Sequence, residues 1–121
     1  MKFILPMPPS INQTYGVNRD KSQPLYKKPA VRDWEEEAGW EVKKQLMNEP
    51  IRTFYKDVYF YVDFYCKVNR DIDAGIKVLL DLFQKQGVYL NDMQIVSLIV
   101  TKQIDLVNPR AEVIIDYHEI S

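Results

Sequence analysis

Hydrophobic and polar positions alternate most clearly over residues 56–67. The inward set is Val58, Phe60, Val62, Phe64 and Cys66, and the opposite set is Tyr59, Tyr61, Asp63, Tyr65 and Lys67. An alternation of period two predicts a strand with one face in the core. The opposite face is aromatic rather than plainly polar, so we expect it to be partly covered, for instance by a partner subunit.

Two stretches instead follow the period of an α-helix. Over residues 31–47, Trp34, Ala38, Val42 and Leu46 recur four positions apart, and Pro50 follows soon after the last of them. Over residues 71–85, an apolar stripe consists of Ile72, Ile76, Leu79, Leu80 and Phe83. Gly87 stands where a helix commonly ends in a left-handed residue, so the second helix is expected to stop just before it.

The remaining segments complete a small α/β (α+β) protein. Residues 2–5, 95–103 and 110–119 are predicted strands, and residues 16–30 are rich in Gly, Asn, Asp, Ser and Pro and are predicted to form a long basic loop. The order is β-α-β-α-β-β, which predicts a mixed four-stranded sheet with two main helices. We expect residues 1–121 to form a single domain, since no linker or internal repeat is visible.

Composition excludes several functional classes. The chain has 121 residues, 46% of them hydrophobic, with one cysteine and one histidine. An internal disulfide and a structural zinc cluster are therefore excluded. The early apolar run at 3–7 is too short to cross a bilayer and is broken by Pro6. We expect a soluble cytoplasmic protein with no membrane partner.

Charge is unevenly distributed although the net charge is only −1. Residues 1–34 contain six lysines and arginines against two aspartates, whereas the rest of the chain is acidic. A basic front end followed by acidic residues is compatible with a phosphate-binding surface beside a carboxylate site. A solvated loop that happens to carry lysines explains the same pattern.

The candidate chemistry lies around residues 69–77 and 91–92. Asp71 and Asp73 are two residues apart at a strand-to-helix connection, Lys77 follows, and Asp92 comes after the Gly87 turn. Magnesium prefers oxygen ligands, and a bound metal activates water for phosphodiester hydrolysis. We therefore expect Asp71, Asp73 and Asp92 to hold a metal ion, and Lys77 to stabilise transition-state charge.

Ordinary structural roles account for the same residues. Asp71 suits a helix N-cap, Asp73 and Lys77 suit an i, i+4 ion pair, and Asn91-Asp92 is a common turn dipeptide. Geometry is also demanding, because a helix over 71–86 is ~24 Å long and residues 87–92 span at most ~17 Å. A helix that begins nearer Asp73 would close most of that gap.

Three separated runs resemble the RusA family of Holliday-junction resolvases, small endonucleases of phages and prophages. PPSINQTY at 8–15 resembles the family's Pro-Pro-Ser-x-Asn-x-x-Tyr signature, and RDIDAGIK at 70–77 resembles its Arg-Asp-x-Asp-Asn-x-x-Lys motif. The runs LD at 80–81, GVY at 87–89 and LNDMQIV at 90–96 resemble the family's later conserved run. The order and separation of all three runs carry the resemblance.

The resemblance implies a magnesium-dependent homodimer (manganese being a possible substitute) that cuts four-way DNA junctions by paired symmetric nicks, in DNA recombination and repair. It implies metal binding by Asp71, Asp73 and Asp92 and a catalytic role for Lys77. For contact with branched DNA, the basic loop and the motifs together nominate Asn12, Tyr15, Arg19, Lys21, Lys27, Lys28, Lys67 and Arg70.

Two positions depart from the family pattern. Ala74 replaces an asparagine, and Asn91 replaces the first aspartate of the later pair. Ala74 cannot make the hydrogen bonds of an amide, so support for the metal could be weaker. The alternatives are thus a non-catalytic junction-binding module with a decayed metal site, or a structural protein that never meets DNA.

Overall fold

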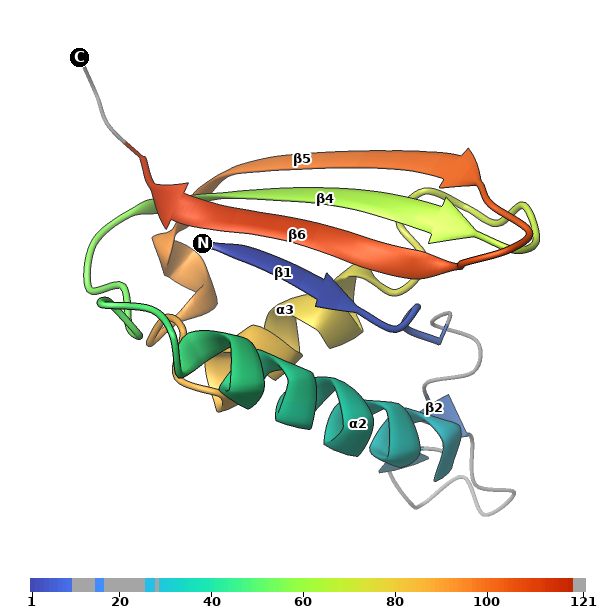
Figure 1. Cartoon of the computed structure of the whole chain (residues 1–121), viewed down its shortest axis with the longest axis horizontal. Helices are drawn as coiled ribbons and strands as arrows, with labels where there is room; N and C mark the ends of the chain where they lie inside the picture. The colour runs from blue at the N-terminus through green and yellow to red at the C-terminus, as the bar shows by residue number, and fades with distance from the viewer. Residues whose placement is uncertain (10–14, 17–25, 28, 119–121) are drawn as a thin grey trace.

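A four-stranded mixed sheet forms one layer of the protein (Figure 1). The computed structural model describes residues 1–9, 15–16, 26–27 and 29–118. The strands are β1 (Lys2–Leu5), β4 (Val58–Cys66), β5 (Ile95–Ile104) and β6 (Arg110–Tyr117), and their spatial order is β1-β6-β4-β5. Strand β4 pairs in parallel with β5 and antiparallel with β6, which confirms the predicted mixed sheet.

Both main helices, α2 (Pro29–Leu46) and α3 (Ile76–Lys85), lie on the same side of the sheet (Figure 1). Every second residue of β4 faces them and is buried, as the alternation predicts. The core between the two layers includes Trp34, Ala38 and Val42 from α2, and Leu79, Leu82 and Phe83 from α3. The predicted fold class and its two helices are therefore confirmed. Within the described residues, no helix has both the length and the apolar character needed to cross a membrane.

The parallel pairing of β4 with β5 determines where the candidate residues lie. A parallel connection must cross over, and here α3 makes that crossing. Asp71 and Asp73 follow the end of β4, whereas Asp92 precedes the start of β5. The two groups therefore approach α3 from opposite ends of the sheet.

Helix α3 begins at Ile76, five residues later than the prediction of a helix over 71–85. Residues 72–75 form a turn, and Gly75 precedes the helix with φ of 87°. A left-handed residue cannot continue a right-handed helix, so the prediction that residues 71–75 form the first turn of the helix is wrong. The late start leaves α3 only ten residues long.

Smaller differences concern the loop and the element ends. The predicted loop over 16–30 includes a short antiparallel pair, β2 (Tyr15–Gly16) with β3 (Tyr26–Lys27), and α2 already starts at Pro29. Proline suits the first turn of a helix because an N–H group at that position has no carbonyl partner within the helix. A residue without an N–H therefore loses no hydrogen bond there. A 3₁₀ turn, η1 (Asp92–Gln94), precedes β5 and was not predicted.

Gly87 ends α3 as predicted. Its φ is 76°, its N–H donates to the carbonyl of Gln84, and the N–H of Val88 donates to the carbonyl of Phe83. These two bonds form a Schellman motif, which satisfies carbonyls that the helix end would leave unpaired.

Replacing each left-handed glycine by alanine should separate backbone strain from steric overlap. A Cβ at Gly87 would meet nothing within 4 Å, so Gly87→Ala should cost about 1–2 kcal/mol of unfolding free energy from backbone strain alone. A Cβ at Gly75 would lie 2.8 Å from Pro8 Cγ, so Gly75→Ala should cost about 3 kcal/mol or more. Urea denaturation measures both values. Equal losses of unfolding free energy would contradict the close packing of Gly75 on Pro8.

Candidate active site

Asp71 and Asp73 lie on the exposed turn between β4 and α3. The turn is held by the backbone, since the Ala74 N–H donates to the Asp71 carbonyl at 3.0 Å and the Ile76 N–H to the Asp73 carbonyl at 3.3 Å. The N-cap of α3 is Gly75, so the alternative role of Asp71 as the helix cap is wrong. No ion pair joins Asp73 to Lys77 among the described residues. Ordinary helix capping therefore does not explain this acidic pair.

Arg70 connects the turn to the N-terminal PPS run. Its Nη1 donates to the Pro8 carbonyl at 2.9 Å, and Nη2 is buried without a hydrogen-bond partner within the described chain. Burial lowers the pKa of Arg70. The close packing of Gly75 on Pro8 completes the contact, and Trp34 Nε1 ties the same segment to α2 through the Pro6 carbonyl at 2.9 Å. Two motifs that are sixty residues apart in sequence are thus in direct contact.

Lys102 braces the same turn from β5. Its Nζ donates to the Arg70 carbonyl at 2.6 Å and to Asn69 Oδ1 at 3.1 Å. Sequence reasoning missed this residue. Its partners Asn69 and Arg70 are 33 and 32 positions away in sequence and come close only in the folded chain, so the sequence alone held no signal for this contact.

The Asp92 segment is shaped by two amide side chains. Asn91 Oδ1 accepts a hydrogen bond from the Met93 N–H at 2.9 Å, and Gln94 Oε1 accepts from the N–H groups of Asn91 at 3.0 Å and Leu90 at 2.8 Å. This is a capping box, and asparagine serves its first position as well as aspartate does. The departure at Asn91 is therefore compatible with the local structure.

Gln94 also anchors this segment to the chain before β4. Its Nε2 donates to the carbonyls of Phe54 at 2.9 Å and Lys56 at 3.0 Å, so one side chain makes four hydrogen bonds. Sequence reasoning missed this role as well. The Asn-x-x-Gln spacing was the signal for the cap, but nothing in the sequence identified the two carbonyls.

Asp92 lies next to α3, where Lys77 and Asp81 are one helical turn apart. Partial burial raises the pKa of Asp92, the negative charge of Asp81 raises it further, and Lys77 lowers it. Tyr89 ties the chain that precedes Asp92 to α3, because its buried hydroxyl donates to the Leu80 carbonyl. Asp81 also lines a cleft of about 350 Å³ with Gln84, Lys85 and Leu90. The structure thus adds Asp81 to the acidic groups near Asp92.

The donor set has the chemistry that magnesium requires. Asp71, Asp73 and Asp92 are exposed, and no hydrogen bond or ion pair within the described part of the chain uses their carboxylates. Among the same residues, however, no group of three or more acidic, histidine or cysteine side chains is already arranged around a metal position. Oxygen donors are present and uncommitted, and metal binding by these three aspartates stays a prediction.

Comparison with known proteins identifies the family. The model of the family described as endodeoxyribonuclease RusA matches residues 6–116. The chain belongs to the RusA family. It is also 33% identical over 91 residues to the crossover junction endodeoxyribonuclease RusA of Aquifex aeolicus (strain VF5), a match that covers 72% of this chain and 68% of the relative. The family match includes Pro8, the acidic turn and the Asp92 segment. The structure joins the first two of these through Arg70.

The residues predicted to contact DNA are only partly placed in this RusA-family chain. Asn12, Arg19, Lys21 and Lys28 lie outside the described residues. Tyr15 and Lys27 are opposite each other in the β2–β3 pair. Lys67 is exposed at the end of β4, next to the turn, whereas Arg70 is half-buried against Pro8. DNA contact by these residues stays a prediction.

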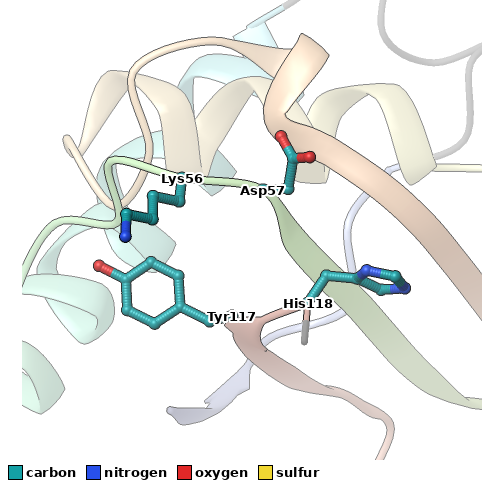
Figure 2. Close-up of a pocket in the computed structure, with 4 residues that line it drawn as sticks. All are labelled: Lys56, Asp57, Tyr117 and His118. Carbon is teal, nitrogen blue, oxygen red and sulfur yellow. The ribbon is translucent and has the colours of Figure 1, made fainter. Parts of the chain in front are cut away.

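A separate pocket of about 700 Å³ lies at the start of β4 and the end of β6 (Figure 2). Lys56, Asp57, Tyr117 and His118 line it, and the His118 N–H donates to the Asp57 carbonyl at 2.9 Å. None of the predicted site residues that the structure describes lines this pocket. Its connection to the candidate site is the Lys56 carbonyl, which accepts from Gln94.

Replacing Gln94 tests whether its amide holds the Asp92 segment. Gln94→Ala should lower the free energy of unfolding by about 1–2 kcal/mol, because four hydrogen bonds are lost at a largely exposed site. Hydrogen exchange should accelerate selectively at the N–H groups of Leu90 and Asn91. Gln84→Ala, an exposed glutamine on α3, is the control. Unchanged exchange at Leu90 and Asn91 would show that the segment does not depend on Gln94.

Proposed function

We propose that this RusA-family endodeoxyribonuclease is a crossover junction resolvase, which cuts four-way DNA by paired symmetric nicks during recombination and repair. One observation carries the proposal: hydrogen bonds brace the acidic turn after β4 and the Asp92 segment before β5, and the carboxylates of both segments are exposed. Exposed carboxylates that no group among the described residues uses are available as oxygen ligands for a cation. The related protein of Aquifex aeolicus is named for action on crossover junctions.

RusA-family resolvases are metal-dependent nucleases, and for this chain we propose Mg²⁺, with Mn²⁺ as a substitute. Asp71, Asp73 and Asp92 would hold the ion. When bound, the ion would acidify a water molecule and neutralise phosphate charge. Lys77 has a separate role, since its ammonium on the first turn of α3 would stabilise the charge that develops on the phosphate oxygens.

DNA would reach this site along a basic border. Lys67 is exposed between β4 and the acidic turn. On charge alone, we assign to the same border four residues of the sequence segment 16–30, namely Arg19, Lys21, Lys27 and Lys28. Cationic side chains that neutralise phosphates provide binding that does not depend on sequence but weakens as salt rises. We therefore propose that affinity comes from this border and cleavage from the aspartates.

Paired nicks call for two active sites, which a symmetric homodimer would supply on a pseudo-symmetric junction. The sheet face that the helices leave uncovered is the proposed contact surface (Figure 1). It includes the half-buried Tyr59, Tyr61 and Tyr65 of β4, of which Tyr65 is covered by Arg110 at 3.7 Å from the ring centroid. Aromatic side chains are enriched in protein interfaces.

Asp73→Asn should abolish cleavage of a synthetic mobile four-way junction in the presence of Mg²⁺, while gel-shift binding of the junction survives. The reason is that the substitution removes a proposed ligand charge without removing a DNA contact. Glu36→Gln, which changes an exposed carboxylate on α2 outside the proposed metal site and dimer surface, is the control and should cut like the wild type. Wild-type cleavage by Asp73→Asn would defeat the assignment, and absence of junction cleavage by the wild type would defeat the function.

Isothermal titration with Mn²⁺ should detect metal binding by the wild type and its loss in both Asp71→Asn and Asp92→Asn. Loss in both variants is expected because the proposed ligands come from two segments and share one ion. Glu36→Gln again serves as the control. Binding that survives either substitution would remove that residue from the ligand set.

A further inference from the structure

The turn between β5 and β6 carries two unusually exposed apolar side chains. Leu106 is 70% exposed and Val107 is 93% exposed, and Val68, in the segment after β4, is 72% exposed. Exposed turns are normally polar, because apolar side chains there gain nothing from the fold. These three residues, called here the apolar tip, therefore need an explanation outside the packing of the chain.

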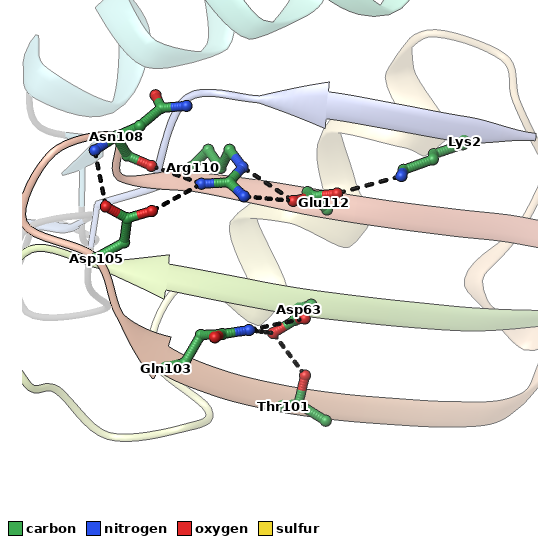
Figure 3. Close-up of polar contacts among 8 residues, drawn as sticks. All are labelled: Lys2, Asp63, Thr101, Gln103, Asp105, Asn108, Arg110 and Glu112. Atoms are coloured by element: carbon green, nitrogen blue, oxygen red, sulfur yellow. Dashed lines mark hydrogen bonds and ion pairs between the residues drawn. The ribbon is translucent and has the colours of Figure 1, made fainter.

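The turn that bears Leu106 and Val107 is held firmly. Asp105 Oδ1 accepts hydrogen bonds from the N–H groups of Val107 and Asn108, each at 3.0 Å, and these bonds lower the pKa of Asp105. Arg110 Nη1 binds Asp105 Oδ2 at 3.1 Å and the Asn108 carbonyl at 2.9 Å. Figure 3 shows this network continuing through Glu112 to Lys2 across the sheet. A braced turn presents its apolar side chains in a fixed position.

The apolar tip lies beside the approach to the acidic turn. The Asp105 N–H donates to the Cys66 carbonyl at 2.8 Å, which joins the β5–β6 turn to the last residue of β4. Five residues after Cys66 comes Asp71. Between them lies the exposed Lys67, and Lys102 fixes the carbonyl of Arg70 from β5. The tip thus shares one end of the molecule with the acidic turn and with the exposed Lys67.

We propose that the apolar tip is a wedge that inserts between bases at the branch point of a DNA junction. Rigid apolar side chains that enter between base steps unstack them and bend the duplex. Bases at a branch point lack a continuous stack, so they are easier to separate than bases within a duplex. The inference rests on branched DNA as the substrate of the proposed function.

A protein partner fits this feature less well. Two side chains on a turn, with Val68 beside them, offer far less area than the ~800 Å² per partner of a stable interface. The nearby cation Lys67 and the adjacent acidic turn also match a nucleic acid with a bound metal better than an apolar protein surface. The partner of the tip is therefore DNA at its point of weakest stacking.

The test combines Leu106→Ser with Val107→Ser and measures binding in EDTA, so that cleavage does not enter. Junctions carry 2-aminopurine at the branch point, and its fluorescence rises when the base is unstacked. The double variant should lose that rise and bind the junction about tenfold more weakly, while its affinity for linear duplex stays within about twofold. Met47→Ser with Ile51→Ser, exposed apolar residues between α2 and β4, is the matched control and should match the wild type in every assay.

Two results would overturn the wedge. Junction binding and fluorescence equal to the wild type would show that the tip does not touch the branch point. A changed oligomeric state of the double variant in size-exclusion chromatography would assign the tip to a protein contact. Cleavage with Mg²⁺ is scored separately, so a wild type that unstacks the branch point without cutting it would refute the proposed nuclease function and leave the wedge intact.

Discussion

The left-handed backbone of Gly75 is the constraint on which the candidate site depends. At φ of 87° an alanine would be strained, and its Cβ would also meet Pro8 and Arg70. Helix α3 therefore cannot extend back through the acidic turn. Asp71 and Asp73 stay on a separate turn with their carboxylates exposed, instead of being absorbed into the cap of the helix. The same close approach brings the N-terminal PPS run against the turn.

Helix α3 then separates two braced acidic segments. The acidic turn is held at the end of β4 through Arg70 and Lys102, and the Asp92 segment is held before the start of β5 through Gln94. Partial burial raises the pKa of Asp92 there, and repulsion by the negative charge of Asp81 raises it further. A cation would relieve such repulsion, so an arrangement that is unfavourable for the bare protein is reasonable for a metal-dependent enzyme.

The sequence predicted what depends on local pattern. The alternation of β4 and the stop of α3 at Gly87 follow from side-chain periodicity and backbone chirality, and both are confirmed. The predicted start of α3 was wrong because the actual start depends on a contact between Gly75 and Pro8, more than sixty residues apart in the sequence. The role of Gln94 was missed for the same reason, since its partners at Phe54 and Lys56 are close only in the folded chain. The three aspartates were nominated by their spacing and by the family resemblance. Whether they bind one metal ion together stays a prediction.

The most direct test of the account is the position of a bound cation. Crystals grown with Mn²⁺ would locate the ion by its anomalous scattering. We predict one site in each protomer with oxygen ligands from Asp71, Asp73 and Asp92, the two segments having closed upon it. A manganese ion held by Asp81 and Asp92 without either aspartate of the acidic turn, or no ion at saturating Mn²⁺, would contradict the account.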